Sequence, residues 1–303
     1  MAEPRFVYHP DYYCDIGEHV FRTEKYGLLA RRLVETGVVP PDGFLRPEPA
    51  TRGQLELVHT AAYVSDLLAA RHTQRTMRSE MPIGPRIISA FVLAAGGTIL
   101  ACRTALRERT IAMNLGGGFH HAFPDWAEGF CYINDAAVGV RAALQDGPAE
   151  RAMVVDCDLH QGNGTARIFR DDSRVFTFSI HQENLYPIKE RSDLDVGLQD
   201  FCSGRAYCDR LQEALPPLLD EHKPQLIVYV AGADPYEGDL LGNLLLSMED
   251  MRRRDDIVLG ACARRGVPAA VVLAGGYSPD VKDTVDLHYG TACSVVEHAR
   301  RYC

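Results

Sequence analysis

Two residue types that bind metals stand two positions apart in the segment DCDLH (156–160). In extended backbone, side chains two residues apart point the same way, so Asp158 and His160 can approach one cation together. A second carboxylate, Asp234, follows another apolar run in the segment GADP (232–235). Two carboxylates and one imidazole suit zinc with an open position for water. Because the set is rich in oxygen, it would also accept ferrous iron.

Two adjacent histidines, His120 and His121, follow three glycines in the segment GGGFHH (116–121). Imidazole titrates near neutrality, so the pair could serve as a general base and acid. A phenol follows two further glycines in AGGY (274–277), where Tyr277 could donate a hydrogen bond to a developing oxyanion. Each motif alone has an ordinary alternative: a capping aspartate, a solvated histidine loop or a tyrosine used in packing.

Short apolar runs of strand length recur between periodic segments. They lie at 151–156, 174–180, 225–231 and 268–274, with another strand-like run at 111–115. Near-continuous apolar runs suit strands buried on both faces of a parallel sheet. Helical periodicity separates the runs at 134–144, 205–219, 248–263 and 281–300, and the first third adds helices around 19–36, 51–59 and 86–107. We therefore expect an α/β fold with a mainly parallel, doubly wound sheet flanked by helices, forming a single domain over 1–303.

The chemical motifs all follow predicted strands. In an open α/β sheet, ligands bind outside the carboxyl ends of the strands, so one pocket could collect all four motifs. Their conjunction favours an active site more than any motif alone. The segment 71–85, with two prolines, is the best candidate for a mobile surface loop. The acidic region of Glu183, Asp193 and Asp195 is expected to be a solvated loop.

Composition narrows the classes of function. A formal net charge of −9 argues against a surface that neutralises nucleic acid phosphates. The N-terminal residues lack the pattern of a secretory signal, and the apolar stretch 87–102 is too interrupted to span a bilayer, so we expect a buried helix there. The nine cysteines form no Cys-x-x-Cys pair, which favours reduced thiols in a cytoplasmic, or in a eukaryote nuclear, protein. No interface patch or heptad run is evident, and we expect a monomer.

Five segments in order resemble the histone deacetylase family, which has the arginase–deacetylase fold. They are GGGFHHA (116–122), GFCYINDAA (129–137), DCDLHQGNG (156–164), AGADPYEGDLLG (231–242) and AGGY (274–277). The resemblance runs from about residue 5 to the C-terminus. The sequences HQGNG and EGDLLG and the short N-terminal region look most like those of class IV members.

The resemblance implies a role for each motif residue. It implies Asp158, His160 and Asp234 as zinc ligands, His120 and His121 as the tandem histidine pair, and Tyr277 as the residue that polarises the scissile carbonyl. It makes Asp156 the carboxylate that orients the first histidine. Asn163 takes the position that is Asp in class I members. An amide cannot stabilise an imidazolium by charge, so we expect His121 to have the lower pKa of the pair and to act as the base.

The resemblance also implies how an acyl-lysine side chain would be held. The backbone carbonyl of Gly129 would accept the substrate amide N–H, and Phe130 would form one wall of the tunnel. Leu185 or Tyr186 would form the opposite wall, and Gly275 and Gly276 would line the turn before the tyrosine. A structural K⁺ or Na⁺ site beneath the zinc would use a further set of residues: Asp156, Asp158, His160, Ser179 and Ile180.

The implied activity is zinc-dependent hydrolysis that removes acetyl or longer fatty acyl groups from lysine side chains of proteins or peptides. One alternative is deacetylation of small acylated amines such as acetylpolyamines. A binding or scaffold protein with a degenerate pocket is a third reading, and the intact ligand set together with Tyr277 argues against it. Some class IV members favour long acyl chains, and the 71–85 loop is where such a preference would be decided.

Overall fold

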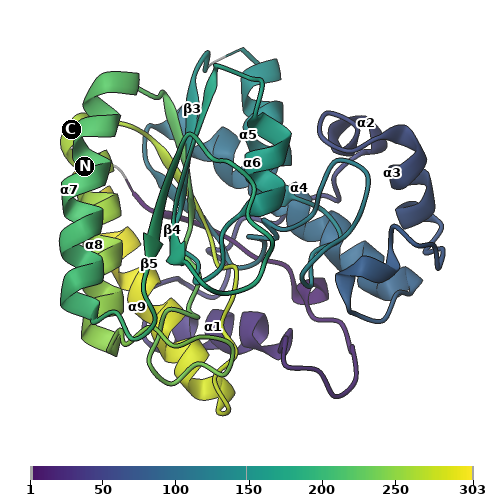
Figure 1. Ribbon diagram of the computed structural model, residues 1–303, viewed down its shortest axis with the longest axis horizontal. Helices are drawn as coiled ribbons and strands as arrows, with labels where there is room; N and C mark the ends of the chain where they lie inside the picture. The colour runs from purple at the N-terminus through teal and green to yellow at the C-terminus, as the bar shows by residue number, and fades with distance from the viewer. Residues whose placement is uncertain (1–2, 148, 302–303) are drawn as a thin grey trace.

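The computed structural model describes residues 3–147 and 149–301, and seven strands of this part form one sheet (Figure 1). The sheet order is β1-β2-β7-β6-β3-β4-β5, and every neighbouring pair is parallel. The strands are β1 (Arg5–Val7), β2 (Ile111–Asn114), β3 (Ala152–Asp156), β4 (Val175–Gln182), β5 (Leu194–Leu198), β6 (Leu226–Val230) and β7 (Ala269–Val272). The expected parallel, doubly wound sheet is therefore confirmed.

Helices cover both faces of the sheet, as Figure 1 shows. On one side lie α4 (Pro85–Glu108), α5 (Asp135–Gln145) and α6 (Asn163–Phe169). On the other side lie α1 (Glu24–Glu35), α7 (Gly204–His222), α8 (Met248–Arg265) and α9 (Val281–Ala299). The short helices α2 (Arg52–Leu55) and α3 (Ala61–Leu68) stand beyond the sheet, with α3 packed on α4.

The core explains why the strands are apolar throughout. In β3, Met153 and Val155 belong to one buried cluster with α7 and α8, whereas Ala152 and Val154 belong to the cluster under α4 and α5. Successive side chains of a strand point to opposite faces. Because both faces are covered, neither set can be polar, and the resulting run shows no alternation.

The longest apolar segment forms α4, as expected for 87–102. Within the described part of the chain, α4 is the one helix long and apolar enough to cross a membrane, and 83% of its most apolar window is buried inside the protein. Its residues pack on α5, β2 and β7, which identifies it as a core helix.

Several boundaries differ from the sequence expectation. The helix expected over 19–36 begins only at Glu24, the first residue of α1. The hydroxyl of Thr23 accepts from the backbone N–H of Cys14 and donates to its carbonyl, which holds the preceding segment as a loop. The helix expected over 51–59 is limited to the four residues of α2. Two short edge strands, β1 and β5, and the helix α6 were not expected.

The acidic region expected to be a solvated loop is more ordered than that. Asp195 lies in β5, and its carboxylate accepts hydrogen bonds from the side chain of Gln161 and the backbone of Ser192. Asp193 accepts from both the backbone N–H and the hydroxyl of Thr177. Glu183, Asp193 and Asp195 are all exposed, as expected, but Asp195 lies in a strand and not in a loop, because these hydrogen bonds fasten the edge strand to β4 and to the loop after β3.

Candidate metal centre and its pocket

The three predicted metal ligands meet at the carboxyl edge of the sheet. Asp158 and His160 follow β3, and Asp234 follows β6, the neighbouring strand. One ligand atom from each residue lies within 4.8 Å of the others, and all three residues are buried. The Nδ1 atom of His160 is 3.2 Å from Oδ1 of Asp158 and 3.2 Å from Oδ2 of Asp234. This compact buried donor set fits a divalent cation.

Backbone N–H groups hold both carboxylates in place. Asp158 accepts from the backbone of His160 and of Gly275, while Asp234 accepts from the backbone of Leu159. At Gly275 a Cβ atom would stand 2.1 Å from Oδ2 of Asp234 and 2.8 Å from Oδ2 of Asp158. Only glycine fits there, so the AGGY turn can close over the carboxylates.

The electrostatics of the cluster also favours binding of a positive charge. Burial and the neighbouring Asp158 carboxylate raise the pKa of Asp234 to about 7. Burial lowers the pKa of His160, but hydrogen bonds to Asp158 and Asp234 outweigh burial and raise it to about 10. Two buried carboxylates therefore retain a proton on the imidazole between them, which a bound cation would have to displace.

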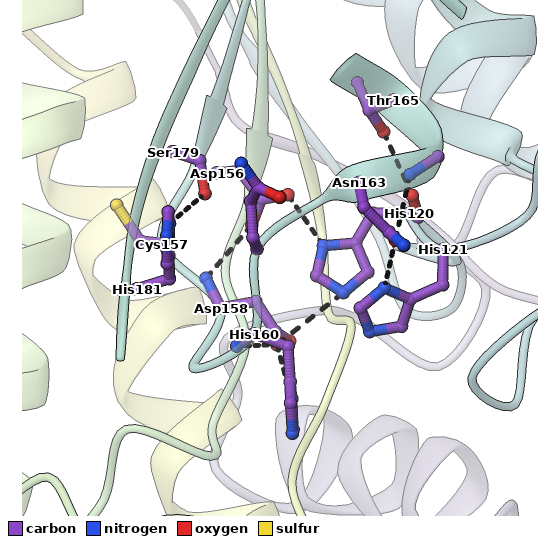
Figure 2. Close-up of polar contacts among 12 residues, drawn as sticks. His120, His121, Asp156, Cys157, Asp158, His160, Asn163, Thr165, Ser179 and His181 are labelled. Carbon is purple, nitrogen blue, oxygen red and sulfur yellow. Dashed lines mark hydrogen bonds and ion pairs between the residues drawn. The ribbon is translucent and has the colours of Figure 1, made fainter. Parts of the chain in front are cut away.

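The tandem histidines lie beside this cluster on the segment that follows β2 (Figure 2). Their rings are 4.1 Å apart between centroids. The Nδ1 atom of His120 is 2.7 Å from Oδ2 of Asp156, and that of His121 is 2.8 Å from Oδ1 of Asn163. Each imidazole thus has its own partner behind it, a carboxylate for the first and an amide for the second.

The two partners are associated with opposite pKa shifts. Burial lowers the pKa of His120, but the charges of Asp156 and Asp158 outweigh burial and raise it to about 9. Burial and the neighbouring charges of His120 and His160 lower the pKa of His121 well below its usual value. The order agrees with the expectation that His121 has the lower pKa: both rings are buried, and only His120 has a carboxylate partner whose charge outweighs burial.

A cavity of about 200 Å³ opens from the ligand cluster to the surface. Its lining residues come from seven separate stretches of the chain: Glu80, His121, Gly129, Phe130, His160, Leu185, Tyr186, Leu241 and Tyr277. The pocket therefore brings together the expected metal ligand His160, one histidine of the pair, the tyrosine and both walls expected from the sequence. Leu185 and Tyr186 both line it, so the two alternatives for the second wall are not exclusive.

Gly129 and Tyr277 occupy defined places in the pocket wall. At Gly129, where φ is +50°, a Cβ atom would lie 2.6 Å from His121 and 2.8 Å from the hydroxyl of Tyr186. Tyr277 is buried, and its ring packs edge-on against Phe130 at 5.8 Å between centroids. Burial and the carboxylates of Asp234 and Asp158 raise the pKa of Tyr277 well above 10, so its phenol keeps its proton and remains a donor.

The residues expected to hold a monovalent cation lie close behind the ligand loop. Asp156 at the end of β3 pairs in register with Ser179 of β4, next to Ile180. The hydroxyl of Ser179 is 2.9 Å from Nδ1 of His181, whose pKa burial lowers to about 4. A neutral imidazole with its hydrogen on Nε2 would accept a hydrogen bond from that hydroxyl, which would leave the Ser179 oxygen lone pairs available to a cation.

Two acidic residues of the site were missed from the sequence. Glu80, from the 71–85 loop, lines the cavity, and the carbonyl of Ser79 in the same loop accepts from the backbone of Phe130. Glu128 contacts Asn163 behind the histidine pair. The position of Glu128 directly before the GFCYINDAA segment was the available signal. The loop contains a 3-10 turn, η2 (Met77–Ser79), and three buried residues, Thr76, Ser79 and Met81.

A parallel α/β sheet with a buried Asp-His-Asp set at its carboxyl edge defines a class of protein that could hold a metal ion beside two histidines. The family described as "Histone deacetylase domain" matches residues 19–291, and the chain belongs to this histone deacetylase family. Resemblance to class IV in particular stays a prediction.

Relatives and solved structures agree with this membership. The chain is 42% identical over 285 residues to an uncharacterized protein of Picosynechococcus sp., covering 93% of this chain and 95% of that one. It is 31% identical over 270 residues to histone deacetylase 2 of Arabidopsis thaliana, covering 86% of this chain and 70% of that one. The crystal structure of a histone deacetylase homologue from Aquifex aeolicus superposes with a TM-score of 0.85 at 24% identity, over 97% of this chain and 84% of that one. That last likeness establishes the shared fold.

Proposed function

We propose that this protein is a zinc-dependent amidohydrolase that removes acetyl or longer acyl groups from lysine side chains of proteins or peptides. The observation that carries the proposal is the buried cluster of Asp158, His160 and Asp234 donors beside a cavity that His160, His121 and Tyr277 line. Family membership supports the class of reaction, a deacetylase-type hydrolysis.

The ligand set would hold the divalent cation through one nitrogen and carboxylate oxygens. A cation there would polarise the substrate carbonyl and make a water molecule more acidic. The remaining chemistry belongs to the side chains around it. Zinc suits the three-ligand set with an open position, and ferrous iron would be accepted by the same donors.

His121 is the base in this proposal. Its low pKa keeps the ring neutral at pH 7, and it lines the cavity, so it can take a proton from the attacking water. The same proton can then pass to the departing amine. His120, held protonated by Asp156, adds a positive charge beside the reaction.

The substrate would be oriented by groups from three loops. The phenol of Tyr277 would donate to the developing oxyanion, and the carbonyl of Gly129 would accept the amide N–H. Phe130 and Tyr186 offer aromatic walls to the lysine methylenes. Gly275 and Gly276 shape the turn that presents the tyrosine, and Gly276, at φ +141°, is in a conformation open mainly to glycine.

A monovalent cation, K⁺ or Na⁺, is proposed behind the ligands. Its donors would be the side chains of Asp156, Asp158 and Ser179 and backbone carbonyls at His160 and Ile180. A cation there would offset part of the negative charge of the two aspartates, which are buried.

A small acylated amine such as an acetylpolyamine is the second candidate substrate. Glu80 favours it, because this exposed carboxylate lines the cavity and would attract a cationic amine at the mouth. The same carboxylate could instead accept backbone N–H groups of a peptide, so the substrate length must be decided by assay.

The test is hydrolysis of a short peptide carrying acetyl-, octanoyl- or myristoyl-lysine, and of acetylated diamines, by the zinc-loaded protein and its His121→Ala variant. We expect turnover of an acyl-lysine peptide by the wild type and its loss in the variant. Faster turnover of the amines, with little cleavage of any peptide, would support the second candidate. No hydrolysis of either class by protein with stoichiometric metal would reject the enzymatic proposal.

A further inference from the structure

The amide of Asn163 has contacts on both sides that fix its orientation. Its Oδ1 accepts from the backbone N–H of Gly164 at 2.9 Å and lies 2.8 Å from Nδ1 of His121. Its Nδ2 donates to Oε1 of Glu128 at 2.8 Å and lies 3.5 Å from the carbonyl of Ile188. If the amide were flipped, its NH₂ group would point at the backbone N–H of Gly164, and its oxygen would point at the Glu128 carboxylate and the Ile188 carbonyl. None of these contacts could then be a hydrogen bond. Because Oδ1 therefore faces the histidine, Nδ1 of His121 must carry the hydrogen and Nε2 is left as the acceptor.

Glu128 accepts hydrogen bonds on both of its carboxylate oxygens. Oε1 accepts from Asn163, while Oε2 accepts from Nη2 of Arg78 at 3.0 Å and from the indole N–H of Trp126 at 3.1 Å. The guanidinium of Arg78 also lies over the Trp126 ring, 4.7 Å from its centroid. The Glu128 side chain is only 13% exposed, so these protein donors largely replace water. Donors on both sides require a residue that only accepts, and glutamine would turn its NH₂ group toward one of them.

We infer that Glu128 is a positioning residue for the base: by holding Asn163, it keeps His121 in the tautomer with hydrogen on Nδ1. The inference deepens the proposed function, since it assumes that Nε2 of His121 takes the proton. It also explains how an asparagine can hold this imidazole as firmly as Asp156 holds His120. The negative charge sits one side chain further from the ring, where Arg78 of the 71–85 loop balances it.

The arrangement predicts that positions 128 and 163 compensate for each other. In Asn163→Asp, the introduced carboxylate would face that of Glu128 across a hydrogen-bonding distance, with no proton between them. In Glu128→Gln, an amide NH₂ would face either Asn163 or the donors Arg78 and Trp126. In the double variant, the glutamine oxygen can face Arg78 and Trp126 while its NH₂ group donates to the introduced aspartate. The contacts with His121, Gly164, Arg78 and Trp126 are then satisfied again, and only the long contact with the Ile188 carbonyl loses its donor.

The kinetic test compares zinc-loaded wild type, Glu128→Gln, Asn163→Asp and the double variant on an acetyl-lysine peptide. We expect each single change to lower kcat by about 10- to 100-fold with little change in KM, which is typical when a group that orients a functional histidine is lost. The double variant should recover most of kcat. If the two losses instead multiply, the residues act independently and the inference is overturned.

A nitrogen NMR measurement tests the tautomer without relying on turnover. In zinc-loaded protein labelled with ¹⁵N-histidine, with His121 identified by His121→Ala, we expect hydrogen on Nδ1 in the wild type and a change in Glu128→Gln. Hydrogen on Nε2 in the wild type would overturn the inference even if a variant failed to fold. If the wild type hydrolysed no acyl amine, the proposed function would fail, while this measurement would still decide the role of Glu128.

Glu108→Gln is the matched control. Glu108 is also a partly buried glutamate that accepts from two arginines, Arg5 and Arg107. It ends α4, whereas the 71–85 loop precedes α4, and a helix of this length separates them by about 35 Å. The control should leave kcat and the His121 signal unchanged, and an equal effect in both variants would mean that loss of a buried charge, not loss of positioning, lowers activity.

Discussion

The Nδ1 atom of His120 lies 2.7 Å from a carboxylate oxygen of Asp156, the residue that ends β3. The same strand end therefore supplies a carboxylate to the histidine pair and, two residues later, the proposed ligand Asp158. On its other side, Nε2 of His120 is 3.6 Å from Oδ1 of Asp158. The imidazole is thus held between two buried carboxylates, which favours its charged form.

Activity should fall on the alkaline side of neutrality when His120 loses its proton. Its pKa is raised to about 9 in the metal-free protein, and a bound cation would offset the Asp158 charge, so the alkaline limb of kcat/KM should lie below about 9. Asp156→Asn removes the largest charge that raises this pKa, so the limb should move to lower pH. On the acid side, the low pKa of His121 should keep the rate flat through pH 6.5.

The pH–rate profiles of wild type, Asp156→Asn and a surface control check this expectation. Asp146→Asn is the control, because Asp146 is exposed and pairs with Arg103 at the surface. An alkaline limb at the same pH in wild type and Asp156→Asn would show that His120 is not the group that titrates.

Metal affinity should increase with pH. His160, with its pKa raised to about 10, must lose a proton to bind the cation, and Asp234, with its pKa raised to about 7, must lose another below that pH. We therefore expect about one proton released per zinc near pH 8 and more near pH 6. Calorimetry in buffers with different ionisation enthalpies measures this number. Binding without proton release at pH 8 would contradict the expectation.

The sheet and the positions of the chemical motifs could be predicted because both depend on local sequence. Apolar runs such as 225–231 can be buried on two faces only in a covered parallel sheet, and the polar residues after them must then gather at one edge. The edge strand β5 could not be predicted in this way. Its residues are alternately exposed, and its place depends on side-chain bonds such as that from Gln161 to Asp195, far apart in sequence.

The role of Glu128 was hidden for a similar reason. Its position next to Gly129 marks it as a neighbour of a motif but not as a partner of Asn163, which is 35 positions away and reaches it only through the fold. Asn163 itself was identified by resemblance, and its amide orientation required knowledge of all its partners. The sequence therefore indicated the residues proposed to touch a metal or substrate, whereas the residues that hold them became apparent only from the fold.

Arg254 of α8 should support the metal site from behind. This buried guanidinium donates to the carbonyls of Cys157 at 3.3 Å and Gly232 at 2.5 Å, which lie on the two strand ends that carry the ligands, and it pairs with Asp255. Arg254→Met would leave the Asp255 charge buried without its partner, and we expect a loss of about 3–5 kcal/mol in the free energy of unfolding. Zinc affinity should also fall by about 10- to 100-fold.

Denaturant unfolding and zinc competition with a chelator measure these two effects. Arg253→Met is the control from the same helix, because Arg253 is half exposed and pairs with Asp209 at the surface. Its unfolding free energy should change by no more than about 0.5 kcal/mol. Equal zinc affinity in wild type and Arg254→Met would mean that the hydrogen bonds of Arg254 to the two strand ends are not needed to hold the metal ligands.

Tyr277→Phe should separate transition-state stabilisation from substrate and metal binding. Burial and the nearby carboxylates raise the pKa of the phenol, so it keeps its proton at working pH. Its hydrogen-bond donor is therefore removed only by substitution. The ring would still pack against Phe130, and no metal ligand is changed. We expect kcat to fall by about 10²- to 10³-fold, with little change in KM or in zinc affinity.

Tyr289→Phe on α9, whose ring lies under the guanidinium of Arg32, is the control and should retain full activity. Unchanged kcat in Tyr277→Phe would remove the tyrosine from the mechanism, whereas a loss accompanied by weaker zinc binding would assign it a structural role at the metal site.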